Sequence, residues 1–415
     1  MALVATTVWE VRQAGNAVNG GGFNDRIPGT SVDYSQQNAS QLSIINLVGS
    51  AASVTVTSVA AGFTNAMVGN IIRIRGGANF TVGFYEIVAF NAANSVNLDR
   101  IPCTGAGVNG LAEVGGAQNN FDLIDVVVVP GNTVHVKSGT YAAHPAVTIT
   151  AAGTKQSPLS ILGYNVARGD APTANNRPLI EMDINSFKFG AVINIKHIRF
   201  SGSNVKLLDC TQVGAAIFLI ENCKFSHTAV AGAASCIGIG QGNDALSVLD
   251  CEFSGLGPLT YGISAQFYPI FTVMNCYFHN LNLGIFVAGS EFPQICFNIF
   301  AQVNFGIYLS SSYAVIVLNS FIQTTTGVYT DATSAGTLCM NNTFSDCAAA
   351  GLDGLFKAVL YNNFFNCATP WIGGTLNPVD NNTFVNPQFV TPGSNYALQR
   401  TSGLIDRAFS MRLGV

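Results

Sequence analysis

The chain has 415 residues, of which only 10% are charged and 48% are apolar; its net charge is −4 and its mean hydropathy is +0.35. We find no basic patch suited to nucleic acid, no polybasic segment suited to a membrane surface, and no apolar run near the ~20 residues that cross a bilayer. Because globular proteins carry ~25% charged residues, we expect a chain this apolar to bury surface between subunits as a homotrimer.

Residues 1–40 are predicted to be an extended attachment arm. The segments Gly20–Phe23 and Asp33–Gln37 show neither a helical nor a strand period. Trp9 is the expected anchor of this arm. The first residues lack the positive region and the cleavage site of a signal peptide, so we expect no export by that route and no transmembrane segment.

Residues 41–117 are predicted to form a small β barrel or sandwich. Val54–Thr57 alternates in polarity, Ile71–Arg75 partly alternates, and Gly76 and Gly77 supply a turn. Gly115 and Gly116 then read as a linker to the rest of the chain.

Residues 118–415 carry an internal repeat, which is the strongest signal in the sequence. A phenylalanine recurs every 19 to 28 residues, with Phe200 as a weaker first member. Helical repeats run to ~33–47 residues, whereas this period fits one coil of three short strands stacked in parallel on the next coil, ~4.8 Å away. The predicted core stack consists of Phe225, Phe253, Phe278, Phe300, Phe321, Phe344, Phe365 and Phe384.

A second column should lie two residues before each phenylalanine. It reads first as three cysteines, Cys223, Cys251 and Cys276, and then as asparagine. Stacked asparagine amides can bond to their neighbours above and below, so a structural ladder is predicted. Its members are Asn298, Asn319, Asn342, Asn363 and Asn382. The ten cysteines form no Cys-x-x-Cys pair and are interpreted as buried thiols rather than as a zinc site or disulfides.

The segments Pro130–Tyr141 and Ala152–Tyr164 resemble the opening coils of the pectate-lyase-like right-handed parallel β-helix superfamily. The Asn-Asn-x-Phe coils resemble its later repeats, and Tyr396–Leu398 with Thr401–Asp406 resembles its closing segment. The resemblance implies an all-β protein in which residues 118–415 are a right-handed parallel β-helix. This fold hosts lyases, hydrolases, adhesins and phage spikes, so it does not specify a function.

Candidate catalytic residues are few. Asp250 and Glu252 are two residues apart and would share one face of a strand, with Glu221 and Lys224 one coil earlier. We interpret these four as surface charge at a coil corner. We expect no metal and no cofactor, and Ca²⁺ would enter only with lyase chemistry. Trp371 is a weak candidate for a sugar-binding platform, and a cap on the last coils is the preferred interpretation.

The leading functional hypothesis is a phage virion structural protein, such as a spike, a fibre or a capsid-decorating rod. It would assemble in the host cytoplasm as a homotrimer and dock on other virion proteins through the arm. The rod would either display a surface for host polysaccharide or simply protrude. No nucleic acid or membrane partner is expected. The alternative is a polysaccharide lyase, or less favoured a hydrolase, that cleaves acidic glycans along the β-helix groove near Asp250, Glu252, Glu221 and Lys224. A surface adhesin is the third possibility, and it would need an export route.

Overall fold

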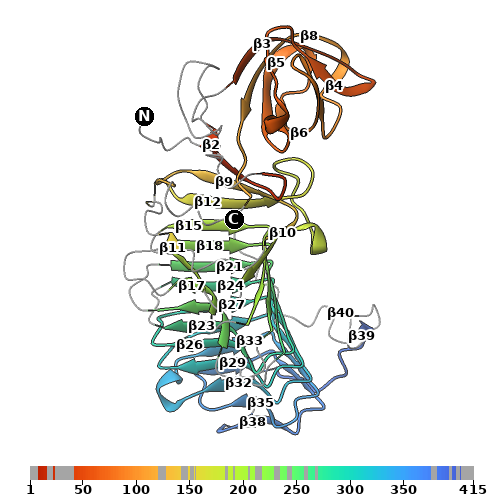
Figure 1. Ribbon diagram of the computed structural model, residues 1–415. Coiled ribbons are helices and arrows are strands. Elements are labelled where there is room, and N and C mark those ends of the chain that lie inside the picture. The colour runs from red at the N-terminus through yellow and green to blue at the C-terminus, as the bar shows by residue number, and fades with distance from the viewer. Residues whose placement is uncertain are drawn as a thin grey trace. The chain divides into compact units, whose positions relative to one another are not determined.

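The chain folds into two compact units, which comprise Met1–Glu181 with Val192–Ile198 and Met182–Ala191 with Arg199–Val415 (Figure 1). The computed structural model describes residues 8–15, 22–23, 42–119, 128–141, 148–149, 154, 156–182, 186–189, 192–203, 206–210, 217–228, 234–240, 245–256, 260–266, 270–374, 381–391, 395–398 and 402.

The first unit contains a closed antiparallel barrel, which confirms the predicted small β module. Its strand order is β3-β4-β7-β6-β5-β8, and Ile44, Val56 and Ile74 are among the side chains buried inside it. The barrel strands are β3 (Leu42–Ser50), β4 (Ser53–Thr57), β5 (Ile71–Phe80), β6 (Gly83–Ala92), β7 (Ser95–Leu98) and β8 (Cys103–Gly115).

The first unit also contains the first coils of the solenoid, and a strand from the predicted arm joins them. β1 (Val8–Val11) pairs in parallel with β9 (Thr133–Lys137) and antiparallel with β2 (Gly22–Phe23). Trp9 is fully buried, and its indole N–H donates to Asn132 Oδ1 at 3.0 Å. Residues 8–11 are therefore part of a sheet and not of a free arm; most of residues 1–40 lies outside the described residues. The remaining strands of these coils are β10 (Thr140–Tyr141), β11 (Thr148–Ile149), β12 (Leu159–Tyr164), β13 (Leu179–Met182) and β15 (Ile193–Lys196).

A buried ionic cluster accompanies β1. The Glu10 carboxylate is fully buried and accepts hydrogen bonds from Arg12 at 3.0 Å and from Arg168 at 2.5 Å. Glu86 of β6 pairs with Arg12 at 2.7 Å and with Lys137 at 2.5 Å. Burial alone would raise the pKa of Glu10, but the Arg168 and Arg12 guanidiniums hold the pKa of this carboxyl below its usual value. Both carboxylates are thus paired, as buried charges must be.

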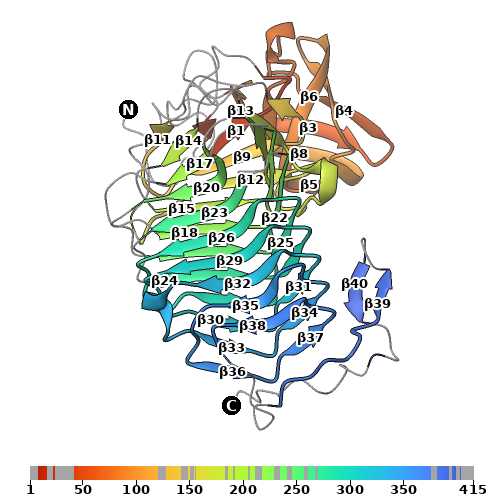
Figure 2. The same ribbon diagram turned by 90° about the horizontal axis from the view of Figure 1, so that it is seen from below.

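The second unit is a stack of coils whose strands form three parallel sheets (Figure 2). Sheet 1 contains β18 (Ile217–Glu221), β21 (Ala245–Leu249), β24 (Ile270–Met274), β27 (Gln294–Cys296), β30 (Val315–Val317), β33 (Leu338–Met340) and β36 (Ala358–Leu360). Sheet 2 contains β16 (Arg199–Gly202), β19 (Lys224–His227), β22 (Glu252–Gly255), β25 (Tyr277–His279), β28 (Ile299–Ala301), β31 (Ser320–Ile322), β34 (Thr343–Ser345) and β37 (Asn363–Phe365). Sheet 3 contains β14 (Phe187–Phe189), β17 (Lys206–Cys210), β20 (Ala234–Ile239), β23 (Thr260–Gln266), β26 (Leu283–Ala288), β29 (Phe305–Ser310), β32 (Thr326–Thr330), β35 (Ala350–Asp353) and β38 (Thr369–Ile372).

Few other elements occur in the described part of the chain. β39 (Phe389–Thr391) and β40 (Asn395–Leu398) form a separate antiparallel pair. The helical elements are the 3₁₀ turns η1 (Asn65–Met67), η2 (Ala174–Asn176) and η3 (Ala332–Ser334). Among the described residues, no helix has both the length and the apolar character that crossing a membrane requires.

A stack of phenylalanine rings runs through the core of the second unit. Successive ring centroids lie 4.7–5.2 Å apart and successive planes agree within 9°. Close packing leaves no room beside the rings, because a Cβ added at Gly306 would lie 2.6 Å from Phe321 Cδ1. The stacked rings are Phe200, Phe225, Phe253, Phe278, Phe300, Phe321, Phe344 and Phe364.

The prediction is wrong for the last two members of the stack, Phe365 and Phe384. Phe364, not Phe365, pairs with Phe344 and is buried. Strand alternation then turns Phe365 away from the core. Phe384 follows the last strand of sheet 2, its ring is tilted by 36° at 6.2 Å from Phe364, and 58% of its surface is exposed. It lies at the end of the column and not within it.

The asparagine ladder follows the first turn of each coil, between sheets 1 and 2. The Asn298 backbone N–H and Nδ2 both donate to Asn319 Oδ1, at 2.9 and 3.0 Å. Asn319 and Asn342 repeat this pattern one coil later each time. The next member is Asn362, which donates to Asn382 Oδ1 at 2.8 Å.

The predicted ladder member Asn363 is incorrect, because the register of this coil is shifted by one residue, as it is for Phe365. Asn363 belongs to β37, and its Nδ2 donates to the Val385 carbonyl at 2.9 Å. Above the asparagines, the Cys276 N–H donates to Asn298 Oδ1 at 2.9 Å, so the cysteines continue the same column.

Replacing Asn319 by leucine should destabilise the protein by about 2–4 kcal/mol, because two buried donors of Asn298 lose their acceptor. Asn319→Cys should cost less, since the Cys223 N–H already donates to Cys251 Sγ at 3.4 Å in this column. Urea denaturation measures both losses, with the exposed Gln294→Ala as control. Equal stability of Asn319→Leu and the control would contradict the ladder.

Candidate functional site

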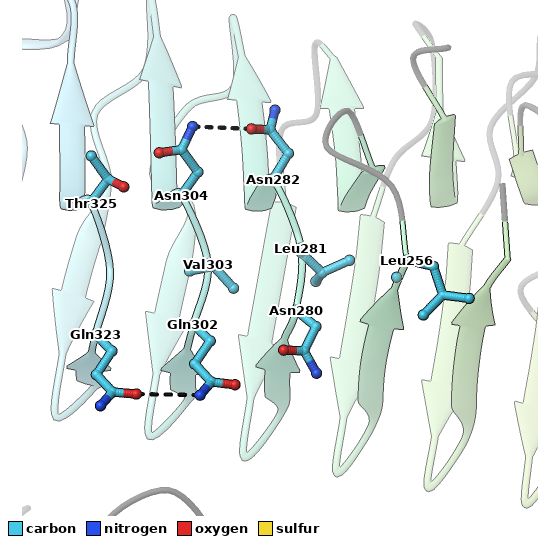
Figure 3. A pocket seen from close by; sticks show the side chains of 10 residues that line it. Leu256, Asn280, Leu281, Asn282, Gln302, Val303, Asn304, Gln323 and Thr325 are labelled. Carbon is cyan, nitrogen blue, oxygen red and sulfur yellow. Dashed lines mark hydrogen bonds between the residues drawn. The ribbon is translucent and has the colours of Figure 1, made fainter. Parts of the chain in front are cut away.

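The turns that join sheet 2 to sheet 3 line a groove of about 740 Å³ in the second unit (Figure 3). Its lining comes from four successive coils, so equivalent positions of each coil recur along it. The lining residues are Gly255, Leu256, Asn280, Leu281, Asn282, Gln302, Val303, Asn304, Gln323 and Thr325.

Two rows of polar side chains border this groove (Figure 3). One row is Asn280, Gln302 and Gln323, and Gln302 Nε2 donates to Gln323 Oε1 at 3.3 Å. The other row includes Asn282 and Asn304, and Asn304 Nδ2 donates to Asn282 Oδ1 at 3.1 Å. A side-chain amide carries both donors and an acceptor, so both rows can bind a ligand that offers hydroxyl groups.

Backbone conformation explains part of the first row. Asn280, Gln302 and Gln323 have φ of 54°, 56° and 52°. This left-handed region is costly for most side chains and is tolerated best by asparagine among those with a Cβ. The turn residue that follows each of them points inward: Leu281 and Val303 are buried and form the floor. The groove therefore has an apolar floor between amide borders.

An aromatic strip lies on the outer face of sheet 3 on the same three coils. Phe286, Tyr308 and Tyr329 are in register on β26, β29 and β32, and all three are half-buried. The ring centroids are 5.6 Å apart for Phe286 and Tyr308 and 4.5 Å apart for Tyr308 and Tyr329. Each ring follows a residue of the second polar row by four positions. We call these three residues the aromatic strip.

A small charged group lies on the outer face of sheet 2. Glu252 Oε1 is 2.8 Å from Lys224 Nζ and 3.2 Å from His279 Nε2. The hydrogen bond from His279, with the hydrogen bond and charge of Lys224, overcomes the effect of partial burial and lowers the pKa of Glu252 to about 2. Glu252 is therefore a stable carboxylate rather than a proton donor near neutral pH.

The other two catalytic candidates lie in different elements from Glu252. Asp250 lies in the turn between β21 and β22 with φ of 53° and is exposed. Because this turn interrupts the alternation, Asp250 and Glu252 are not successive residues of one strand face, and that prediction is wrong. Glu221 ends β18 in sheet 1. In the portion that the structure describes, no three His, Cys, Asp or Glu side chains gather as a metal site would require.

Trp371 lies on β38, the last strand of sheet 3. It pairs with Leu352, which is buried. Its indole Nε1–H donates to the Gly354 carbonyl at 2.8 Å, and its ring meets Phe356 edge to face. These contacts are those of a cap on the last coils, and a sugar-binding role for Trp371 stays a prediction.

The groove and the aromatic strip were not predicted, although the repeat carries their signal. In three successive coils an amide residue follows the core phenylalanine by two positions, as in Phe300 and Gln302. Asparagine or threonine follows it by four positions, as in Asn304. His279, the partner of Glu252, directly follows Phe278. The positions two and four residues after each core phenylalanine therefore repeat as regularly as the inward columns do.

The Glu252 ion pair should make stability depend on pH below about 5. The folded pKa of Glu252, about 2, lies below its usual value of 4.5, so the stabilisation is complete above pH ~4.5 and is lost as the pH falls towards 2. The stability difference between wild type and Glu252→Gln should therefore shrink over this interval. Denaturation midpoints at several pH values test this, with the exposed Glu291→Gln as control. A difference that does not change between pH 5 and 2 would rule out the pairing.

Comparison with known proteins gives one family match, to the solenoid. Residues 191–389 match the family model described as a right handed beta helix region, and no curated protein matches the chain. Among solved structures, the chain is similar to the native GH136 lacto-N-biosidase from Eubacterium ramulus, with a TM-score of 0.43 and 11% identity over 65% of this chain and 64% of that chain. The match thus spans less than two thirds of the length of that chain.

It is also similar to the catalytic unit of the thermostable GH87 alpha-1,3-glucanase from Streptomyces thermodiastaticus strain HF3-3, with a TM-score of 0.28 and 8% identity over 83% of this chain and 86% of that chain. The family match agrees with the stack of in-register parallel coils that the second unit displays. Residues 191–389 therefore form a right-handed parallel β-helix.

Proposed function

We propose that this protein binds a neutral polysaccharide chain through the groove and the aromatic strip. The observation that carries the proposal is the repetition of the amide borders on successive coils. Asn280, Gln302 and Gln323 border one side of the groove, and Asn282 and Asn304 lie on the other. Because equivalent residues repeat at the strand spacing of ~4.8 Å, the groove suits a ligand that repeats along its length.

The chemistry of the lining favours a neutral ligand with many hydroxyl groups. None of the ten lining residues carries a charge. Amide side chains can donate to and accept from hydroxyl groups, and the exposed Leu256 side chain of the lining can contact the carbon face of a sugar ring. An acidic glycan would instead require cations in the lining.

The aromatic strip extends this surface. Tyr308 and Tyr329 offer flat apolar rings that end in a hydroxyl group, a combination suited to a ligand with both apolar and polar faces. Tyr308 lies on β29, four residues after Asn304, and Tyr329 lies on β32, four residues after Thr325. One extended saccharide chain could therefore contact both the groove and the strip.

A polysaccharide hydrolase is the alternative, and Glu252 is its best candidate residue. Glycosidases of the common type use two carboxyl groups, one of which has a raised pKa to act as the acid. Glu252 has a lowered pKa and is held by Lys224 and His279, so it could serve only as the base or the nucleophile. Binding without cleavage therefore accounts better for the observed residues.

Placement in a phage virion, docking through residues 1–40 and contact with host glycans are further proposals, as is the adhesin alternative. A virion rod that contacts glycans and an adhesin would both use the proposed saccharide binding.

The binding proposal predicts that neutral glycans are retained on a glycan array and that groove variants lose them. Asn304→Ala and Tyr308→Ala should each weaken binding by about three- to tenfold, as expected for the loss of one hydrogen bond or one ring contact. Titration calorimetry measures the change, and Gln294→Ala on sheet 1 should bind as the wild type does.

The same glycans separate binding from cleavage. Incubation should release no new reducing ends and no unsaturated products. Release that disappears in Glu252→Gln would establish the hydrolase alternative, and retention of acidic glycans alone would contradict the neutral groove.

A second proposal concerns self-association. Ile270, Phe292 and Tyr313 occupy equivalent positions at the corner between sheets 3 and 1, two residues before the paired residues Thr272, Gln294 and Val315. They are 58%, 66% and 47% exposed. An apolar ridge on three successive coils is unusual on a monomer surface, and a homotrimer would cover it.

Light scattering should therefore find a trimer, and Phe292→Ser should shift the equilibrium towards monomer, because the central side chain of the ridge loses its apolar contact. The fold should be retained, since Phe292 lies outside the core. A wild-type protein that stays monomeric over a wide concentration range would contradict the proposal.

A further inference from the structure

Two cysteines lie on successive coils in the same turn that forms the groove. In this turn the inward position reads Leu281, Val303, Thr324 and then Cys347 and Cys367. The backbone register is regular here, because the Ala348 N–H donates to the Thr324 carbonyl at 2.8 Å and the Ala368 N–H donates to the Cys347 carbonyl at 3.0 Å. Cys347 and Cys367 are therefore equivalent residues of adjacent coils.

Their side chains are also neighbours. Cys367 Sγ lies 3.6 Å from the Phe344 carbonyl of the preceding coil, and Cys347 Sγ lies 3.3 Å from Thr324 Oγ1 of the coil before it. Equivalent residues of adjacent parallel strands are ~4.8 Å apart. This lies within the Cα separation of roughly 4.4–6.8 Å that a disulfide spans, so the pair can close without moving the backbone far.

Access distinguishes this pair from the other cysteines. Cys223, Cys251 and Cys276 also stack on successive coils, but all three are buried. Cys367 is half-buried, and so is Cys296, which is paired with Met274 and Val317 and has no cysteine beside it in its sheet. Only the Cys347–Cys367 pair thus combines a neighbouring thiol with a route from solvent, among the described residues.

We propose that Cys347 and Cys367 are a redox site that closes to a disulfide between adjacent coils when a low-molecular-weight disulfide is present. The Cys367 thiolate attacks one sulfur of oxidised glutathione, which forms a mixed disulfide and releases one glutathione thiolate. Cys347 then loses its proton to solvent and attacks Cys367 Sγ, which releases the second glutathione thiolate. Two protein thiols are oxidised by two electrons, and one glutathione disulfide is reduced to two thiols.

The order of attack follows from the surroundings of the two sulfurs. Cys367 is the more accessible, and the neighbouring Cys347 thiol lowers the pKa of Cys367. The same interaction and burial raise the pKa of Cys347. The thiolate is the attacking species in disulfide exchange, so Cys367 reacts first and Cys347 resolves the mixed disulfide.

The new bond would join coils at the end of the stack nearest to Trp371. It closes a loop between residues 347 and 367 and so restricts the unfolded chain. We therefore expect oxidation to raise the midpoint of thermal unfolding by a few degrees and to leave the groove intact. This effect is independent of any glycan bound.

The experiment treats the full chain with oxidised glutathione and then with an alkylating agent. Before alkylation, the intact mass should fall by two hydrogen atoms; after alkylation, peptide mapping should recover Cys347 joined to Cys367. The rise in the unfolding midpoint should be absent in Cys347→Ser and Cys367→Ser and present in Cys296→Ser, the matched control with a half-buried thiol.

Three results would overturn the proposal. The first is a stable glutathione adduct on Cys367 that Cys347 never resolves. The second is a bond between other cysteines, and the third is no change in mass under conditions that modify Cys296. Peptide mapping of the wild type decides each of these without relying on the stability of a variant.

Discussion

The structure depends on one constraint, which is that each strand of the second unit pairs with its own equivalent one coil away. Identical side chains are thereby placed on top of one another at the strand spacing. Inside, this produces a column of phenylalanine rings separated by 4.7–5.2 Å. At the turn, it produces asparagines whose amides supply the acceptor for the coil before, as between Asn298 and Asn319. Replacing one of these side chains therefore also removes a hydrogen-bond acceptor or a ring contact from the neighbouring coil.

The same register builds the outer surface. The turn between sheets 2 and 3 has a constant length, so the register that stacks the rings inside also places Gln302 next to Gln323 and Asn304 next to Asn282. Positive φ at the first row restricts the residues that fit there, but the second row and the aromatic strip lie outside that constraint. Repetition of Phe286, Tyr308 and Tyr329 on a solvent-facing strand therefore points to a use beyond folding, which is why the strip supports saccharide binding.

Periodicity predicted the parts of this fold that repeat. Phe225 to Phe344 were assigned correctly because each coil offers a single phenylalanine at the anchor. The assignment failed at Asn362–Phe365, where two asparagines precede two phenylalanines and either pair satisfies the pattern. The pairing of β1 with β9 could not be predicted either, since Trp9 and Asn132 are far apart in the sequence and belong to no repeat. The core columns alone do not predict the groove, because its polar border residues lie at outward positions of the turns.

In-register stacking also explains why charge is so sparse. Like charges at equivalent positions would lie about 4.8 Å apart and repel each other by about 1 kcal/mol even in water. On sheet 2, Lys224 is in register with Glu252 on one side and with Arg199 on the other, so one contact joins opposite signs and one joins like signs. The cost of stacking like charges favours a low charged fraction, here 10%, without requiring burial between subunits. Self-association must instead rest on the exposed ridge of Ile270, Phe292 and Tyr313, where stacking has gathered apolar side chains that the core does not use.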